Sequence, residues 1–253
     1  MLVTPALRPI ADTGVLVEFA DHIDDSIHQR VLNLDAAIHS KCIVGITELI
    51  PAYSSLFVGY DPLLADYEAV SDEITALLDV SSNTTIDARH WEIPVCYESE
   101  FAPDLPALAE QLELSTEEII TQHTAGRYKV YMYGFAPGYA YLGGVPDAIQ
   151  IPRKPGPVMD IPVGSVMIAG PQSLITTVVM PSGWWVIGRT AQTPLQLQKA
   201  GEHPFLFNVG DTLEFTPVTK GEYLDQVKTP DVKESDVMES SIKENAVTER
   251  GNN

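Results

Sequence analysis

Residues 133–190 constrain the fold more than any other part of the chain, because glycine and proline recur there every few residues. Short apolar runs, such as residues 163–168 and 184–187, lie between them. Glycine reaches backbone conformations that other residues avoid, whereas proline restricts its own φ and has no N–H to donate. The pattern predicts a β-barrel with many tight corners, whose backbone a ligand or a partner can approach closely.

Strand and helix patterns alternate before this segment. Residues 7–10 and 15–19 predict a hairpin or a bulged strand, and residues 42–50 and 53–60 predict two further strands. Apolar residues at helical spacing predict helices over 21–40 and 62–78. With a strand over 90–97 added, the order β-α-β-β-α-β predicts a ferredoxin-like split βαβ domain over residues 1–97.

The pattern changes at residue 98. A helix is expected over 104–111, and the capping-box spacing of Ser115 and Glu118 predicts a second helix that ends near His123. Strands and turns follow up to residue 218, so residues 98–218 are predicted to form a β-barrel domain with two small helices. The polar residues 219–253 contain few aromatic side chains and are expected to be disordered. The whole chain is therefore predicted to be an α+β protein.

Charge and composition exclude several kinds of partner. The 253 residues carry a formal net charge of −20, which argues against binding to nucleic acid and to anionic membranes. The N-terminus does not read as a secretory signal, and no apolar run is long enough to cross a bilayer, so a cytoplasmic protein is expected. Cys42 and Cys96 are interpreted as two buried free thiols, with a disulfide as the alternative.

Few residues in the sequence are candidates for catalysis or for binding a ligand or a metal. No two histidines have the spacing of metal ligands, so no metal site is expected, and the glycine-rich motifs that cradle phosphates are absent. Arg153 and Arg189 are candidate anion anchors, with a structural ion pair as the alternative for each. Ser165 and Gln172 stand on predicted turns, where such side chains more often satisfy the backbone than bind a ligand. A run of alternating aromatic side chains around a Pro-Gly turn predicts one face that forms core or lines a groove: Tyr133, Phe135, Tyr139 and Tyr141.

An ordered set of motifs resembles one family of proteins. The motifs are GFAPGY at 134–139, PR at 152–153, PVGSV at 162–166, IAG at 168–170, GW at 183–184 and IGRT at 187–190. They resemble the family of allophanate hydrolase subunit 1, KipI-type proteins and the B subunit of bacterial 5-oxoprolinase, over roughly residues 5–217. The resemblance implies that the barrel is cyclophilin-like. It also implies a function for His123, which otherwise reads as a histidine interacting with a helix C-terminus.

The resemblance implies three functions. The first is a subunit of an ATP-dependent 5-oxoprolinase, which converts 5-oxo-L-proline to L-glutamate in complex with A-like and C-like partner subunits that share the ATP. The alternatives are a carboxyltransferase of urea degradation and an inhibitor that binds a sensor histidine kinase. The site is predicted in a barrel groove formed by residues 133–141 and 152–172. Its expected catalytic residues are His123 and Arg153, and its expected substrate-binding residues are Tyr133, Phe135, Pro137, Gly138, Tyr141, Ser165, Gln172 and Arg189.

Overall fold

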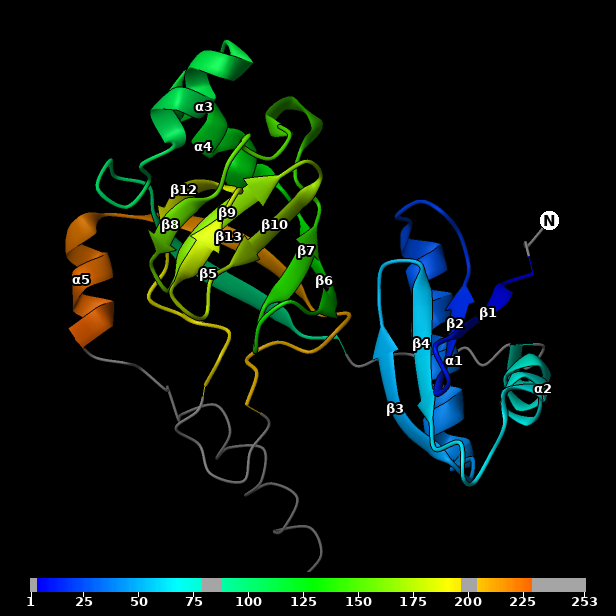
Figure 1. Cartoon of the computed structure of the whole chain (residues 1–253). Helices are drawn as coiled ribbons and strands as arrows, with labels where there is room; N and C mark the ends of the chain where they lie inside the picture. Colours follow the sequence, from blue (N-terminus) through cyan, green and yellow to red (C-terminus); the bar gives the residue numbers. More distant parts are fainter. Residues whose placement is uncertain (1–3, 79–87, 197–203, 229–253) are drawn as a thin grey trace, which may run out of the picture.

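The protein is described by a computed structural model that covers residues 4–78, 88–196 and 204–228. Figure 1 shows a small sheet with two helices, built from the N-terminal part of the chain, beside a larger barrel built from the rest. This arrangement confirms the predicted α+β class with a barrel.

The N-terminal unit is a four-stranded antiparallel sheet packed against two helices. Its strands follow the order β1-β2-β4-β3, and apolar side chains between sheet and helices, such as Val17, Val31 and Val58, are fully buried. Because β2 and β3 are both antiparallel to β4, they run parallel to each other on either side of it. The elements are β1 (Ala6–Ile10), β2 (Gly14–Glu18), α1 (Asp25–Lys41), β3 (Ile46–Pro51), β4 (Ser55–Tyr60) and α2 (Tyr67–Leu78).

The strand predicted over 90–97 does not belong to this sheet. The strand β5 (His90–Cys96) pairs in parallel with β13 (Thr212–Val218) and is one of the strands that form the barrel. The place beside β2 is already occupied by β1, which a short turn joins to β2, with Ile10 opposite Gly14. A local hairpin costs little chain entropy to close, whereas β5 becomes buried between two barrel strands. The expected connectivity was therefore wrong at its last strand, and the predicted domain boundary at residue 97 lies too late in the chain.

The barrel is closed, with the strand order β10-β7-β6-β13-β5-β12-β9. Its interior is filled by large apolar side chains such as Tyr128, Ile168 and Phe215. The helices α3 (Leu105–Leu112) and α4 (Thr116–Ala125) lie together at one end (Figure 1). The predicted capping box at the start of α4 is confirmed, since Ser115 and Glu118 each bond the other's backbone N–H. The remaining barrel strands are β6 (Tyr128–Tyr133), β7 (Ala140–Gly143), β9 (Ser165–Ala169), β10 (Gln172–Ile175) and β12 (Trp185–Arg189).

A two-stranded hairpin lies outside the closed barrel. It consists of β8 (Val158–Ile161) and β11 (Met180–Ser182), and it follows the short helix η1 (Asp147–Ile149) in the chain. A second apolar cluster, separate from the barrel interior, includes Ile161 of the hairpin, Leu174 of β10 and Trp184. The outer barrel surface therefore has an apolar layer of its own, and this layer positions the candidate site.

The first part of the predicted disordered tail is ordered. Residues 220–228 form the helix α5 (Lys220–Lys228), while residues 229–253 lie outside the described residues. The Glu222 carboxylate accepts hydrogen bonds from the backbone N–H and hydroxyl of Thr219, as at a helix start. Tyr223 packs on Phe101 with ring centroids 4.7 Å apart. One buried aromatic side chain and a cap thus order a segment whose composition predicted disorder.

The two cysteines differ in burial. Both are free, but only Cys96 is buried, so the prediction of two buried thiols was wrong for Cys42. Cys42 follows α1 directly and adopts a left-handed conformation with φ of 49°. It therefore lies at a helix end rather than in the strand that its apolar neighbours suggested.

Candidate binding cleft on the barrel surface

One small cleft opens on the outer face of the barrel beside the hairpin. Its volume is about 120 Å³. It contains one cationic side chain, two hydroxyl-bearing tyrosines and several apolar groups. The lining residues are Phe135, Tyr139, Tyr141, Arg153, Leu174, Pro181, Ser182, Gly183 and Trp184.

Aromatic rings form the walls of the cleft. Tyr139 and Tyr141 are two positions apart at the start of β7, so both side chains point to the outer face of the barrel. The ring of Tyr141 meets Trp184 edge-on, with centroids 6.0 Å apart. Phe135 is 76% exposed and adopts φ of 69°, and its ring is tilted against Tyr139. Such walls suit a flat or compact ligand that has apolar surface.

Arg153 supplies the positive charge of the cleft. Its guanidinium lies 5.5 Å from the centre of the Trp184 ring. Among the residues that the structure describes, no carboxylate forms an ion pair with this arginine. The side chain is exposed and therefore available to an anionic ligand, which guanidinium binds in a bidentate manner.

The neighbouring Lys154 is held in place instead. Its ammonium donates to Asp104 Oδ2 at 2.7 Å, and the same oxygen accepts the backbone N–H of Val186 at 2.7 Å. The backbone N–H of Lys154 also donates to the carbonyl of Gly183. Asp104 therefore fixes the segment that carries Arg153 against the start of β12.

The variant Asp104→Asn should lower the free energy of unfolding by about 2–3 kcal/mol, because the cation of Lys154 would lose its partner. The two side chains are only 11% and 20% exposed. Urea unfolding measures the effect. The matched control is Asp225→Asn, which breaks a pair with Lys228 whose side chains are 72% and 80% exposed, and which should cost below about 1 kcal/mol. Equal losses in the two variants would contradict the structural role of Asp104.

Tyr139 contributes a hydroxyl that has no partner among the described residues. The residue is 2% exposed, and its hydroxyl makes no hydrogen bond with any residue that the structure describes. Burial raises the pKa of this phenol to about 12, so the group stays protonated near neutral pH and can donate. A buried hydroxyl without a partner costs free energy, and a hydrogen-bond acceptor bound in the adjoining cleft would offset that cost.

His123 does not line this cleft, contrary to the prediction that it lies at the groove edge. It is fully buried at the end of the barrel, where its ring stacks on Phe215 with centroids 4.5 Å apart. Its Nδ1 lies 2.7 Å from the Tyr97 hydroxyl. Burial lowers the pKa of His123 to about 3, so the imidazole is neutral. The helix α4 points this side chain into the apolar core, and sequence spacing cannot reveal that direction.

Arg189 lies at the opposite end of β12 from Trp184. Its guanidinium lies 5.6 Å from the centre of the Phe101 ring. Because a strand rises about 3.3 Å per residue, the length of β12 separates this arginine from the cleft by more than about 10 Å. Arg153 and Arg189 therefore do not act on the same small ligand within this chain.

Ser165 is fully buried and is the first residue of β9, directly after a turn. Its hydroxyl donates to the carbonyl of Pro162 at 2.7 Å, and its backbone N–H donates to Thr176 Oγ1 at 2.8 Å. Gly164 before it adopts φ of 77°, and a Cβ there would lie 2.3 Å from the carbonyl oxygen of Thr190. The motif PVGSV thus encodes a tight turn, and its serine does not reach the cleft.

Gln172 contacts the N-terminal unit instead of a ligand. Its side-chain amide donates to the Tyr53 hydroxyl at 2.8 Å. Nearby, Asp25 of α1 accepts the hydroxyl of Tyr131 at 2.7 Å, and His28 Nε2 lies 2.9 Å from the carbonyl of Tyr131. These contacts bury His28 completely, and burial lowers its pKa to about 4. The two units therefore share a polar interface that sequence periodicity did not reveal.

The segment around the Pro-Gly turn divides between the two sides of the barrel. Tyr133 packs toward the barrel interior, stacks on Phe205 and donates its hydroxyl to the carbonyl of Phe207, so it does not line the cleft. Pro137 accepts the Thr177 hydroxyl through its carbonyl. Gly138 adopts φ of 74°, where a Cβ would lie 2.9 Å from Leu195. The turn between Tyr133 and Tyr139 reverses the chain, so the predicted single aromatic face was wrong for Tyr133.

Five lining residues were missed as candidates. They join the cleft from segments distant in sequence from Phe135 and Arg153: Leu174, Pro181, Ser182, Gly183 and Trp184. Trp184 lies in the Gly-Trp pair that contributed to the family resemblance, so a signal for it was present. Leu174 and Ser182 carry no such signal, since only the closure of the barrel brings them beside Arg153.

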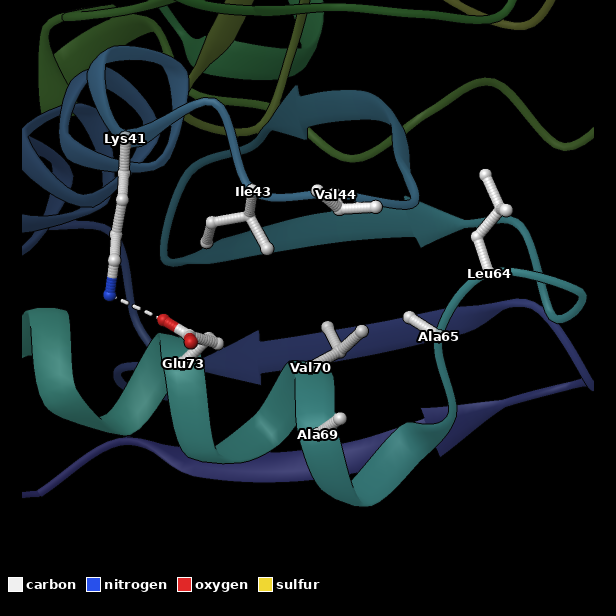
Figure 2. Close-up of a pocket in the computed structure, with 8 residues that line it drawn as sticks. All are labelled: Lys41, Ile43, Val44, Leu64, Ala65, Ala69, Val70 and Glu73. Atoms are coloured by element: carbon white, nitrogen blue, oxygen red, sulfur yellow. Dashed lines mark hydrogen bonds and ion pairs between the residues drawn. The ribbon is translucent and has the colours of Figure 1, made fainter.

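A second hollow, of about 300 Å³, lies in the N-terminal unit (Figure 2). Figure 2 shows Lys41 reaching toward Glu73, with which it forms an ion pair at one end of the hollow. The other lining residues are aliphatic: Ile43, Val44, Leu64, Ala65, Ala69 and Val70. The two charged groups that line this hollow neutralise each other. It is therefore less suited than the cleft on the barrel to bind a charged ligand.

Within the described residues, no group of three or more His, Cys, Asp or Glu side chains could hold a metal ion. None of the described helices is long and apolar enough to cross a membrane.

Comparison with known proteins identifies the family. Residues 5–207 match the family model described as carboxyltransferase domain, subdomain C and D. The chain is 36% identical over 235 residues to the B subunit of the 5-oxoprolinase of Bacillus subtilis, covering 88% of this chain and 97% of that protein. The chain therefore belongs to the family of carboxyltransferase subdomain C and D proteins that includes the 5-oxoprolinase B subunit, as the motifs predicted.

Solved structures share this fold. The crystal structure of TTHA0988 superposes with a TM-score of 0.71 at 30% identity, over 84% of this chain and 40% of that chain. This chain thus spans well under half the length of that protein. The urea amidolyase of K. lactis superposes with a TM-score of 0.72 at 19% identity, over 88% of this chain and 15% of that chain, which shows the fold alone.

Proposed function

We propose that this chain is one subunit of an ATP-dependent 5-oxoprolinase and acts together with A-like and C-like partner subunits. The observation that carries the proposal is the 36% identity to the B. subtilis protein over 97% of its length. The complex would convert 5-oxo-L-proline, ATP and water to L-glutamate, ADP and phosphate.

The chemistry requires activation of a stable lactam. Its amide carbon is a poor electrophile, and phosphorylation of the amide oxygen would create a good leaving group. That step needs cations and aligned donors around the transferring phosphoryl group. The cleft offers one guanidinium, on Arg153, and the sequence contains no phosphate-cradling motif. The ATP site is therefore assigned to the partner subunits, with this chain contributing to substrate binding.

The proposal is tested by purifying the chain together with A-like and C-like partner proteins from the same organism. The complex should hydrolyse ATP only when 5-oxo-L-proline is present, and glutamate should form in equal amount to phosphate. Omitting this chain should abolish the coupling. ATP hydrolysis that does not depend on 5-oxo-L-proline would refute the proposal.

Carboxyl transfer is the second candidate, favoured by the description of the matching family model as a carboxyltransferase domain. The chain contains no biotin-attachment motif, so another protein would have to supply the carboxylated biotin. Adding a carboxylated biotin carrier and urea to the same complex discriminates between the two reactions. Formation of carboxylated urea without any lactam hydrolysis would favour this candidate.

A further inference from the structure

The cleft on the barrel is small, and its volume limits the size of ligand that it can hold. Sites for drug-sized ligands usually occupy about 300–1,000 Å³, and a nucleoside triphosphate needs a site in that range. The cleft measures about 120 Å³. It can therefore enclose only a compact molecule, and a nucleotide could place no more than a fraction of its atoms inside.

Its polar groups define what kind of compact molecule fits. The guanidinium of Arg153 offers paired N–H donors, a geometry that matches a carboxylate. Tyr139 lines the same cleft, and its buried hydroxyl lacks a partner among the described residues, so this residue supplies a second, separate donor. Tyr141 lines the same cleft and interacts electrostatically with both Tyr139 and Arg153. A ligand that satisfies these groups has a carboxylate and, at a distance from it, a neutral acceptor.

The aromatic walls add a third requirement. Phe135, Tyr141 and Trp184 surround the two donors with apolar ring surface. An extended acyclic chain would leave much of this surface uncovered, whereas a small ring presents apolar carbons in a compact shape. A charged amine on the ring would be unfavourable close to the cation of Arg153.

From these features we infer that the cleft binds a small cyclic carboxylic acid with a ring carbonyl, Arg153 holding the carboxylate and the Tyr139 hydroxyl donating to the carbonyl oxygen. The choice of 5-oxo-L-proline as that acid rests on the proposed function. Tyr139 is then a substrate-binding residue whose hydrogen bond also polarises the amide. Arg153 and Tyr139 both belong to this chain, so we expect the chain alone to bind the acid.

Calorimetric titration of the full chain with four compounds tests the inference. 5-Oxo-L-proline carries both features, cyclopentanecarboxylate lacks the carbonyl, 2-pyrrolidinone lacks the carboxylate, and L-proline carries an amine in place of the amide. The chain should bind 5-oxo-L-proline most tightly and L-proline most weakly. ATP alone should not compete with 5-oxo-L-proline.

Two variants test which side chain binds the ring carbonyl and which binds the carboxylate. Tyr139→Phe should weaken binding of 5-oxo-L-proline about tenfold, the value of one hydrogen bond, and leave the affinity for cyclopentanecarboxylate unchanged. Arg153→Met should weaken binding of both acids. Arg127→Met, which changes an exposed arginine outside the cleft, is the matched control and should affect neither.

The inference is overturned if the chain binds none of the acids, if ATP competes for the cleft, or if Tyr139→Phe weakens both acids equally. Its failure is distinguishable from failure of the proposed function. If the complex hydrolyses ATP with 5-oxo-L-proline and the Tyr139→Phe variant has the KM of the parent, the proposed function holds and the inferred binding site is wrong. If the chain binds 5-oxo-L-proline but the complex does not hydrolyse the lactam, the binding site holds and the proposed function is wrong.

Discussion

Replacing Arg153 by methionine is expected to lower kcat/KM of the assembled complex for 5-oxo-L-proline at least about 100-fold. Among the described residues, this guanidinium is the only cation that lines the cleft, and loss of a charge-assisted, bidentate contact to a carboxylate corresponds to roughly 3 kcal/mol. Methionine keeps the apolar stem that packs near Trp184, so the fold should change little. The rate of ATP hydrolysis as a function of 5-oxo-L-proline concentration measures the effect.

The control for this experiment is Arg127→Met in the same complex. Arg127 is exposed and precedes β6, outside the cleft, so its loss should leave kcat/KM within about twofold of the parent. Thermal unfolding of both variants checks that neither substitution disrupts the barrel. If the two variants lose activity to the same extent, the cleft is not where the substrate binds.

The stability of the protein is expected to fall as the pH drops from about 6.5, and His123 should be a main cause. Burial lowers the pKa of its imidazole from the usual 6.5 to about 3 in the folded protein. Below pH 6.5 the unfolded chain takes up a proton at this residue, whereas the folded chain does not do so until near pH 3. Stability present above pH 6.5 is therefore lost on acidification, by about 2 kcal/mol at pH 5 from His123 alone.

The variant His123→Asn isolates this contribution. The asparagine amide can replace Nδ1 as partner of the Tyr97 hydroxyl but does not titrate. The variant should be less stable than the parent at pH 7, because it leaves a cavity beside Phe215, yet it should lose about 2 kcal/mol less between pH 6.5 and pH 5. Urea unfolding at several pH values measures both. An unchanged slope in His123→Asn would show that His123 is not neutral in the folded protein.

Much of the fold could be predicted because it depends on local rules. The capping box at Ser115 and Glu118 and the apolar faces of α1 and α2 are determined by residues close together in sequence. The strand β5 was misassigned because a strand pattern does not specify its partner. Its place depends on β13, which lies more than a hundred residues further along the chain.

The candidate site was only partly predictable for a related reason. Phe135, Tyr141 and Arg153 do line one cleft, as expected for groove residues. Tyr133 packs toward the barrel interior, although it belongs to the same alternating run, because the turn before Tyr139 changes which side each position faces. The family resemblance implied a function for His123 and for Ser165. Both side chains are nevertheless fully buried, one in the barrel core and the other at the start of β9.

The sequence by itself determined the family, the α+β class and the presence of a turn-rich barrel. The spacing of glycine, proline and apolar residues acts over a few positions, and that is enough to specify strands and turns. Only the tertiary structure decided which cation serves the cleft. Arg153 and Arg189 are equivalent as residues, but barrel closure places one beside Tyr139 and Trp184 and the other at the far end of β12. The burial and the neighbours that give a side chain its chemistry arise from contacts between segments that are distant in the chain.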